Sequence, residues 1–334
     1  MIYTGTTLVT GAGGFVGRSL VMHLVSLGTR VRATDRPGTD TAFFRRLGVE
    51  FRPADLTQPH TLEPLFTGDV DRVFHLGAIC NLSTPLERLY PVNVTGVEHI
   101  TRLALREGVK RYIHIGSTSV YGPYPGIPLH EDHARAPQEA YGISKRDGED
   151  VVWRRMAEGL PAVIARPCTV YGPGCNDGAG KAFSRATAIA AIPGHGRHRL
   201  SNIRVEDVAA AAHYLSCQDD AVGQAYNLAD DSNPTLEEAL RLAAQTFGTK
   251  APTLRLPLWL LQPLARIDGA IAALQGRIPE LEYAALRYLH DDYIVDNRKL
   301  KSTGYTLQFP DFRASMEQLS ASHAQGKTPI SGGD

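Results

Sequence analysis

Tyr141 and Lys145 are the two residues of this sequence whose types and spacing best suit proton transfer. A helix is predicted over residues 138–156, and residues four apart on a helix lie on the same face. A tyrosine hydroxyl ordinarily has a pKa of about 10, but a neighbouring ammonium group favours the phenolate. The pair could therefore act as a general base on an alcohol or as a general acid on a carbonyl.

Ser117 could supply a third polar group to the same reaction. It follows a strand predicted over residues 111–115, at the carboxyl end, which is where ligands bind in parallel sheets. Its hydroxyl can donate a hydrogen bond to a substrate oxygen and orient it. A role as the nucleophile of a hydrolase is disfavoured, because no Gly-x-Ser-x-Gly turn surrounds this serine.

A glycine-rich turn early in the sequence predicts a phosphate-binding site. It lies between a strand predicted over 6–10 and a helix predicted over 15–27. Such glycines let the backbone approach a pyrophosphate, which then lies on the N–H groups of the helix N-terminus. The expected contacts belong to the turn and to the first residues of the helix: Gly11, Gly13, Gly14, Phe15, Val16 and Gly17.

Asp35 indicates which dinucleotide binds. It follows a second predicted strand, over 30–34, and lies 18 residues beyond Gly17. A carboxylate at this place accepts hydrogen bonds from the adenosine ribose and repels a 2′-phosphate, which favours NAD. Arg36 comes next, and its guanidinium could hold that phosphate, so NADP is the alternative cofactor.

The first half of the sequence alternates between predicted strands and helices. Further strands are expected over 49–51, 72–76 and 162–165, and a further helix over 92–106. This alternation is typical of the α/β class with a Rossmann-type, doubly wound parallel sheet. The second half has helices predicted over 181–192, 204–215 and 235–247, and an apolar stretch at 254–264 that Pro257 and Pro263 interrupt.

These patterns suggest two structural units. We expect an NAD(P)-binding domain over residues 1–170, to which 200–230 returns, and a smaller, mostly C-terminal substrate-binding lobe over 171–320. The polar tail at 321–334 is expected to be frayed.

Composition excludes several other classes of protein. The 334 residues carry 35 Lys+Arg and 35 Asp+Glu, and this balance disfavours a general nucleic-acid binder. No Cys-x-x-Cys pair occurs, and His195 and His198 lack a third ligand, so no metal site is expected. No apolar stretch is long enough to span a membrane, and the four cysteines suit a reducing cytoplasm.

The order of these motifs resembles that of extended short-chain dehydrogenases/reductases, the NAD-dependent epimerase/dehydratase superfamily, over about residues 5–315. The resemblance implies that Ser117, Tyr141 and Lys145 are catalytic, with Tyr141 and Lys145 also beside the cofactor, and that helices near 92–107 and 138–157 form a homodimer. It implies further cofactor contacts at Asp55, Leu56, Leu76, Gly77, Ala78, Asn93 and Pro167, and substrate contacts at Thr118, Ser119, Thr169 and Arg204.

Departures from the patterns of the subfamilies favour one branch. Thr118 and Ser119 stand where sugar-nucleotide dehydratases have an acidic pair, Thr169 stands where epimerases usually have asparagine, and Leu200 stands where they often carry an arginine. The segments 254–261 and 293–300 resemble those of the 3β-hydroxysteroid dehydrogenase-like branch, and an apolar lid would suit an apolar substrate. A peripheral membrane contact is an alternative role for 254–264.

The sequence therefore predicts an NAD(P)-dependent oxidoreductase that moves a hydride between a secondary alcohol or ketone and nicotinamide. The expected small-molecule substrate is an apolar 3-hydroxy compound, such as a 3β-hydroxysteroid or a 3-hydroxy acid. The alternatives are a nucleotide-sugar 4-epimerase and a non-catalytic NAD(P)-sensing protein.

Overall fold

The computed structural model describes residues 4–123, 128–175, 179–183, 191–275, 277, 279 and 281–324. Its centre is a seven-stranded sheet with the order β10-β6-β5-β4-β1-β2-β3, in which every pair of neighbours is parallel. The strands are β1 (Thr6–Thr10), β2 (Val31–Thr34), β3 (Glu50–Phe51), β4 (Val70–His75), β5 (Arg111–Ile115), β6 (Ala162–Pro167) and β10 (Ala225–Leu228). This topology confirms the predicted α/β, Rossmann-type fold class.

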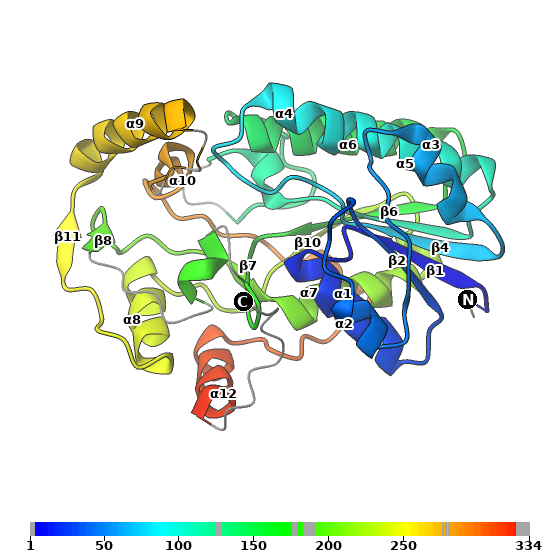
Figure 1. Ribbon diagram of the computed structural model, residues 1–334. Coiled ribbons are helices and arrows are strands. Elements are labelled where there is room, and N and C mark those ends of the chain that lie inside the picture. The colour runs from blue at the N-terminus through cyan, green and yellow to red at the C-terminus, as the bar shows by residue number, and fades with distance from the viewer. Residues whose placement is uncertain are drawn as a thin grey trace.

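Helices cover both faces of this sheet (Figure 1). On one face lie α1 (Phe15–Ser26) and α7 (Val205–Ser216), which pack against each other. On the other lie α5 (Gly96–Arg106) and α6 (Ala140–Ala157). Because both faces are covered, β1, β2, β5, β6 and β10 are buried along their whole length, as parallel strands usually are.

Shorter helices connect the strands. The α-helices among them are α2 (Ala42–Arg46), α3 (Pro59–Leu62) and α4 (Leu86–Tyr90). A further short helix, α11 (Arg298–Ser302), follows the last strand of the chain and packs against β10. The 3-10 turns are η1 (Glu63–Phe66), η3 (Thr118–Tyr121), η4 (Ala179–Phe183) and η5 (Asp219–Ala221), and η2 (Pro91–Thr95) is a π turn. Of these, η3 matters most here, because it begins directly after Ser117 at the end of β5.

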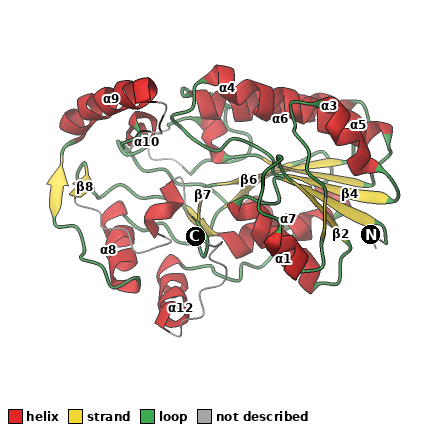
Figure 2. Cartoon of the chain, in the orientation of Figure 1, coloured by secondary structure: helices red, strands yellow, loops and turns green. Residues whose placement is uncertain are grey.

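The remaining elements form a second layer beyond the carboxyl ends of the strands, on the left of Figures 1 and 2. Its helices are α8 (Leu236–Thr246), α9 (Leu258–Gln275), α10 (Tyr283–Arg287) and α12 (Phe312–Ala324). Its strands pair as β7 (Thr169–Tyr171) with β9 (Asn202–Arg204) and β8 (Ala191–Pro193) with β11 (Leu254–Leu256). Thr235 is the N-cap residue of α8 and forms a reciprocal capping box with Glu238.

The structure corrects four predicted boundaries. The helix expected over 92–106 opens with the π turn η2, and α5 begins only at Gly96. The helix expected over 181–192 is wrong at its end, since 191–193 form β8, and residues 184–190 lie outside the described residues. The stretch 254–264 is a strand followed by a helix that contains Pro263. Residues 321–324 of the expected tail continue α12, and the rest of the tail is outside the described residues.

Pro257 and Pro263 do not break α9 because of where they lie. Pro257 immediately precedes the helix and needs no N–H there, and its carbonyl accepts from the N–H groups of Leu260 and Leu261. Pro263 removes one backbone hydrogen bond on an exposed face of the helix.

Candidate active site

The glycine turn after β1 leaves no room for side chains. Gly11 has φ +65°, and a Cβ there would lie 2.6 Å from the backbone nitrogen of Gly77, at the end of β4. A Cβ on Gly17 would overlap the carbonyl oxygen of Gly11. The turn is therefore packed backbone against backbone, which only glycine permits.

The N-terminus of α1 directly follows this turn. Gly14 is its N-cap residue and makes no side-chain cap bond, and the first turn of the helix contains no acidic residue. The N–H groups at this end therefore keep their partial positive charge for an external anion. Phe15 and Val16 begin the helix, so the predicted residues of the turn fit the pyrophosphate of a dinucleotide.

Asp35 lies beside the turn, as predicted from its place after β2. Its carboxylate accepts hydrogen bonds from the backbone N–H groups of Gly13, at 2.9 Å, and Arg36, at 2.8 Å. These bonds hold the carboxylate beside the glycine turn, where it could accept hydrogen bonds from a ribose hydroxyl. Arg36 is exposed.

The other residues expected near the cofactor shape the edge of the sheet. Leu56 packs where Gly77 and Gly96 come close, since a Cβ on either glycine would lie within 2.8 Å of its side chain. Asp55 is engaged locally, because one of its carboxylate oxygens accepts from both the backbone N–H and the hydroxyl of Thr57 at 2.8 Å. Leu76 and Ala78 flank Gly77, and Pro167 is the last residue of β6.

Asn93 joins this edge to α6. Its amide exchanges two hydrogen bonds with the backbone of Ile79, at 2.8 and 3.0 Å, and donates to the hydroxyl of Ser144 at 3.0 Å. Ser144 lies directly before Lys145. The side chain of Asn93 thus fixes the segment after β4 against the helix that carries Tyr141 and Lys145.

Three contacts bring the residues of the predicted catalytic set to one place. Lys145 donates from Nζ to the carbonyl oxygen of Ile115, the last residue of β5, at 2.7 Å. Ser117 follows two residues later, and its Oγ accepts from the N–H of Ser119 at 3.1 Å. A Cβ on Gly142 would lie 2.6 Å from the carbonyl oxygen of Ser119, so the first turn of α6 packs directly on η3.

Cys80 contacts the candidate acid/base and was not predicted from the sequence. Its thiol donates to the hydroxyl of Tyr141 at 3.4 Å, and the cysteine itself is exposed, whereas Tyr141 is buried. The available signal was position alone, because Cys80 follows the Leu76–Ala78 turn at the carboxyl end of β4.

Lys145 is buried. Burial lowers the pKa of its ammonium, while Cys80 and Glu149 act in the opposite direction. Burial also lowers the pKa of His75 to about 3 and that of His114 well below its usual value, and the charge of Lys145 adds to both shifts. Both imidazoles are therefore neutral near pH 7 and add no charge beside Lys145.

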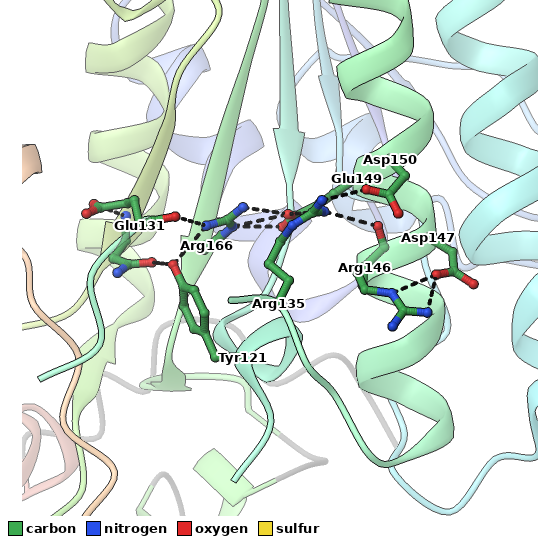
Figure 3. A network of polar contacts seen from close by, with 9 residues as sticks. Tyr121, Glu131, Arg135, Arg146, Asp147, Glu149, Asp150 and Arg166 are labelled. Carbon is green, nitrogen blue, oxygen red and sulfur yellow. Dashed lines mark hydrogen bonds and ion pairs between the residues drawn. The ribbon is translucent and has the colours of Figure 1, made fainter. Parts of the chain in front are cut away.

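A buried ion pair stabilises the packing of β5 and α6 (Figure 3). Arg166 on β6 and Glu149 on α6 are joined by contacts of 2.8 to 3.1 Å, and a Cβ on Gly116 would overlap that carboxylate. Arg166 also donates to the hydroxyl of Tyr121 at 2.8 Å, and Tyr121 donates to Asn227 on β10 at 2.7 Å. The network therefore fixes both ends of the Gly116–Tyr121 segment that contains Ser117.

Two tyrosines from the C-terminal part of the chain also contact residues of the candidate site. Tyr293 donates to the carbonyl oxygen of Thr118 at 2.6 Å, and Tyr288 donates to the carboxylate of Glu139, the residue before α6. Burial raises the pKa of both hydroxyls, so they remain neutral donors. The partners lie 175 and 149 residues apart in sequence, so no local pattern could have predicted these contacts.

The residues expected to contact substrate separate into two groups. Thr118 and Ser119 lie in η3 beside Ser117, and Thr169 lies on β7, opposite Asn202. Arg204 differs, because it bonds to Glu206 and Ser315 and its guanidinium stacks 3.9 Å from the centre of the Phe309 ring. Its observed contacts join β9 to the C-terminal segment.

Known proteins are similar to this chain. The family model described as the NAD dependent epimerase/dehydratase family matches residues 7–229. A ceramide reductase of Caulobacter vibrioides is 33% identical over 257 residues, which cover 76% of this chain and 74% of that protein. The sterol demethylase protein B of Methylococcus capsulatus is 28% identical over 297 residues, covering 85% and 88%.

Two further similarities extend over nearly the whole chain. A 3 beta-hydroxysteroid dehydrogenase/Delta 5-->4-isomerase of Mycobacterium tuberculosis is 26% identical over 341 residues, which cover 94% of this chain and 90% of that protein. The structure of a UDP-glucose 4-epimerase from Thermotoga maritima has a TM-score of 0.77 at 19% identity, covering 96% and 99%. This chain belongs to the NAD dependent epimerase/dehydratase family and is an NAD-dependent enzyme of the oxidoreductase or epimerase type.

Proposed function

We propose that the protein is a dehydrogenase/reductase that moves a hydride between a secondary alcohol and the nicotinamide of NAD, on an apolar 3-hydroxy substrate. The observation that carries the proposal is the packing of α6 on the end of β5. Lys145 bonds to Ile115 there, and Gly142 meets Ser119, so Ser117, Tyr141 and Lys145 share one end of the sheet.

Each of these side chains has one role in the proposal. Tyr141 takes the proton of the substrate hydroxyl during oxidation and returns it during reduction. Ser117 donates a hydrogen bond to the same oxygen and so stabilises the charge that develops on it. The ammonium of Lys145, fixed by Ile115, stabilises the phenolate of Tyr141. NAD, when bound, accepts the hydride or returns it.

The relatives support an apolar substrate. Proteins named for a sterol, for ceramide and for a 3β-hydroxysteroid are 26 to 33% identical to this chain. The neutral residues Thr118 and Ser119 in η3 agree with a reaction that needs no acidic pair. We include Thr118, Ser119 and Thr169 in the substrate site. We leave Arg204 out, because its contacts are to Glu206, Ser315 and Phe309.

We further propose that residues 1–170 and 200–230 bind the cofactor, that the rest of 171–320 binds the substrate, and that α5 and α6 form a homodimer. Asp35 favours NAD over NADP, since its carboxylate lies at the glycine turn.

The experiment is a substrate screen with both NAD and NADP. Purified protein is mixed with sterols, 3-hydroxy acids and UDP-sugars, and reduced cofactor is followed at about 340 nm while sugar isomers are separated. Net reduction of NAD with a sterol or a hydroxy acid supports the proposal. Isomerisation of a UDP-sugar without net reduction would instead establish an epimerase.

A further inference from the structure

Helix α9 presents an apolar stripe that nothing in the described structure covers. Five residues, at spacings of four and three, lie on one side of it: Leu260, Leu264, Ile267, Ile271 and Leu274. Their exposed fractions range from 39% for Leu260 to 89% for Leu274. Trp259, at the start of the helix, is 74% exposed. A continuous apolar surface of this kind marks a site of interaction.

The opposite side of α9 is packed inside the protein. Leu261 and Ala265 are buried against Leu286 of α10. Figure 1 shows α9 at the outer edge of the second layer, with α10 between it and the rest of the molecule. The exposed stripe is therefore a second apolar face of one helix and does not form part of the protein core.

The charges near the stripe are positive. Among the described residues from 254 to 275, the exposed charged side chains are Arg255 and Arg266. Arg255 pairs with Glu237, while Arg266 bonds to the hydroxyl of Tyr283 and has no carboxylate partner among the described residues. Asp268, the acid of the helix, is partly buried and pairs with Arg277.

We propose that α9 docks the protein on an anionic lipid surface, with the stripe inserted among the acyl chains and Arg266 at the headgroups. This inference rests on the proposed function, because an apolar 3-hydroxy substrate dissolves mainly in membranes. A helix with an apolar face and an exposed arginine is suited to lie in the plane of such an interface. No helix among the described residues is long and apolar enough to cross a membrane. A second copy of α9 would present the same Arg266 and no exposed acid to pair with it.

The same helix is linked to the candidate active site through a short series of contacts. Its inner face packs on α10, and Tyr288 follows α10 directly and donates to Glu139, two residues before Tyr141. Tyr293 then reaches the carbonyl oxygen of Thr118. In a protein docked through α9, the side of the candidate site that Tyr288 and Tyr293 contact would thus lie near the lipid in which the substrate is dissolved.

The test is sedimentation of the full chain with vesicles of phosphatidylcholine and phosphatidylglycerol. The wild-type protein should sediment with the vesicles, and less so in high salt or with phosphatidylcholine alone. The double variant Leu264→Glu/Ile271→Glu should reduce the partition coefficient by about tenfold or more. The matched control is Leu27→Glu, which alters a residue 53% exposed at the end of α1 and should leave partition unchanged.

A second readout guards against misfolding of the double variant. The chain has two tryptophans, so Trp153→Phe leaves Trp259 as the only one. Its fluorescence should shift to shorter wavelength when these vesicles are added. Absence of both sedimentation and this shift would overturn the inference, and so would a double variant that sediments like wild type.

Three further outcomes separate the hypotheses. If Leu264→Glu/Ile271→Glu turns a dimer into a monomer in sedimentation velocity while vesicle binding persists, the stripe is an interface between copies and the inference is wrong. Vesicle binding needs no substrate. Docking without any sterol oxidation would therefore contradict only the proposed function, and oxidation of detergent-dispersed sterol without docking would contradict only this inference.

Discussion

The thiol of Cys80, after β4, donates to the hydroxyl of Tyr141 on α6 at 3.4 Å. This contact places an exposed thiol directly beside the hydroxyl of the proposed acid/base. Of the other cysteines, Cys168 and Cys175 are buried and Cys217 is half-buried, so Cys80 is the most accessible of the four. A reagent for thiols can therefore report on Tyr141 without any mutation there.

Alkylation of Cys80 by iodoacetamide should inactivate the enzyme. The added group would occupy the space beside the Tyr141 hydroxyl, and the loss should approach the contribution of acid–base catalysis, about 100-fold or more. NAD should slow the inactivation, since the nicotinamide is proposed to bind beside Tyr141. Cys80→Ser keeps a donor to the tyrosine and should resist the reagent. If protein that mass spectrometry shows to be modified at Cys80 keeps full activity, the proposed catalytic role of the Tyr141 hydroxyl beside Cys80 is contradicted.

Gly17→Ala should weaken NAD binding, because its Cβ would overlap the carbonyl oxygen of Gly11 and displace the turn. We expect the dissociation constant to rise by about tenfold or more, measured by calorimetric titration with NAD. Gly269→Ala is the matched control, since a Cβ there meets nothing within 4 Å. An unchanged affinity of Gly17→Ala for NAD would show that the turn does not bind the cofactor.

Glu149→Gln should destabilise the fold, because it leaves the buried guanidinium of Arg166 without its carboxylate partner. Breaking a buried ion pair from one side typically costs about 3–5 kcal/mol. Urea denaturation would measure this loss. The control is Glu158→Gln, which removes an exposed partner of Arg155 and should change stability by about 1 kcal/mol or less. Equal effects of the two substitutions would refute the importance of the buried network.

Asp230 should make stability depend on pH. Burial raises its pKa to about 8, well above the value of an unfolded aspartate. The unfolded chain therefore loses this proton first as pH rises, and stability falls between about pH 4 and pH 8, by at most about 1.4 kcal/mol per pH unit. Asp230→Asn removes this slope. Denaturation curves across that range would show it, and parallel pH profiles for both proteins would exclude the assignment.

Local signals predicted the parts of the fold that adjacent residues determine. The glycine turn requires backbone contact at Gly11 and Gly17, and glycine itself reveals that requirement. The start of α8 at Thr235 and the strand–helix alternation were equally visible in sequence. Pro263 shows the opposite case, because the burial of Leu261 and Ala265 keeps α9 helical across a residue that locally disfavours it.

Some residues of the candidate site could be found from the sequence, and others only from contacts in the folded structure. Tyr141 and Lys145 could be found from their spacing on one helix, and Asp35 from its distance beyond the glycines. Tyr288 and Cys80 could not, because each meets the site through contacts between distant segments that no repeat or spacing encodes. The contacts of Tyr288 and Cys80 with the site could therefore be identified only from the three-dimensional structure.

Tyr141→Phe tests the central claim, that this phenol transfers the proton in an NAD-dependent hydride transfer. The substitution removes one hydroxyl from a buried ring and should leave the melting temperature and NAD affinity close to those of wild type. With the substrate identified in the screen, kcat should fall by about 100- to 10,000-fold. A variant that binds NAD and still turns over at the wild-type rate would contradict the account.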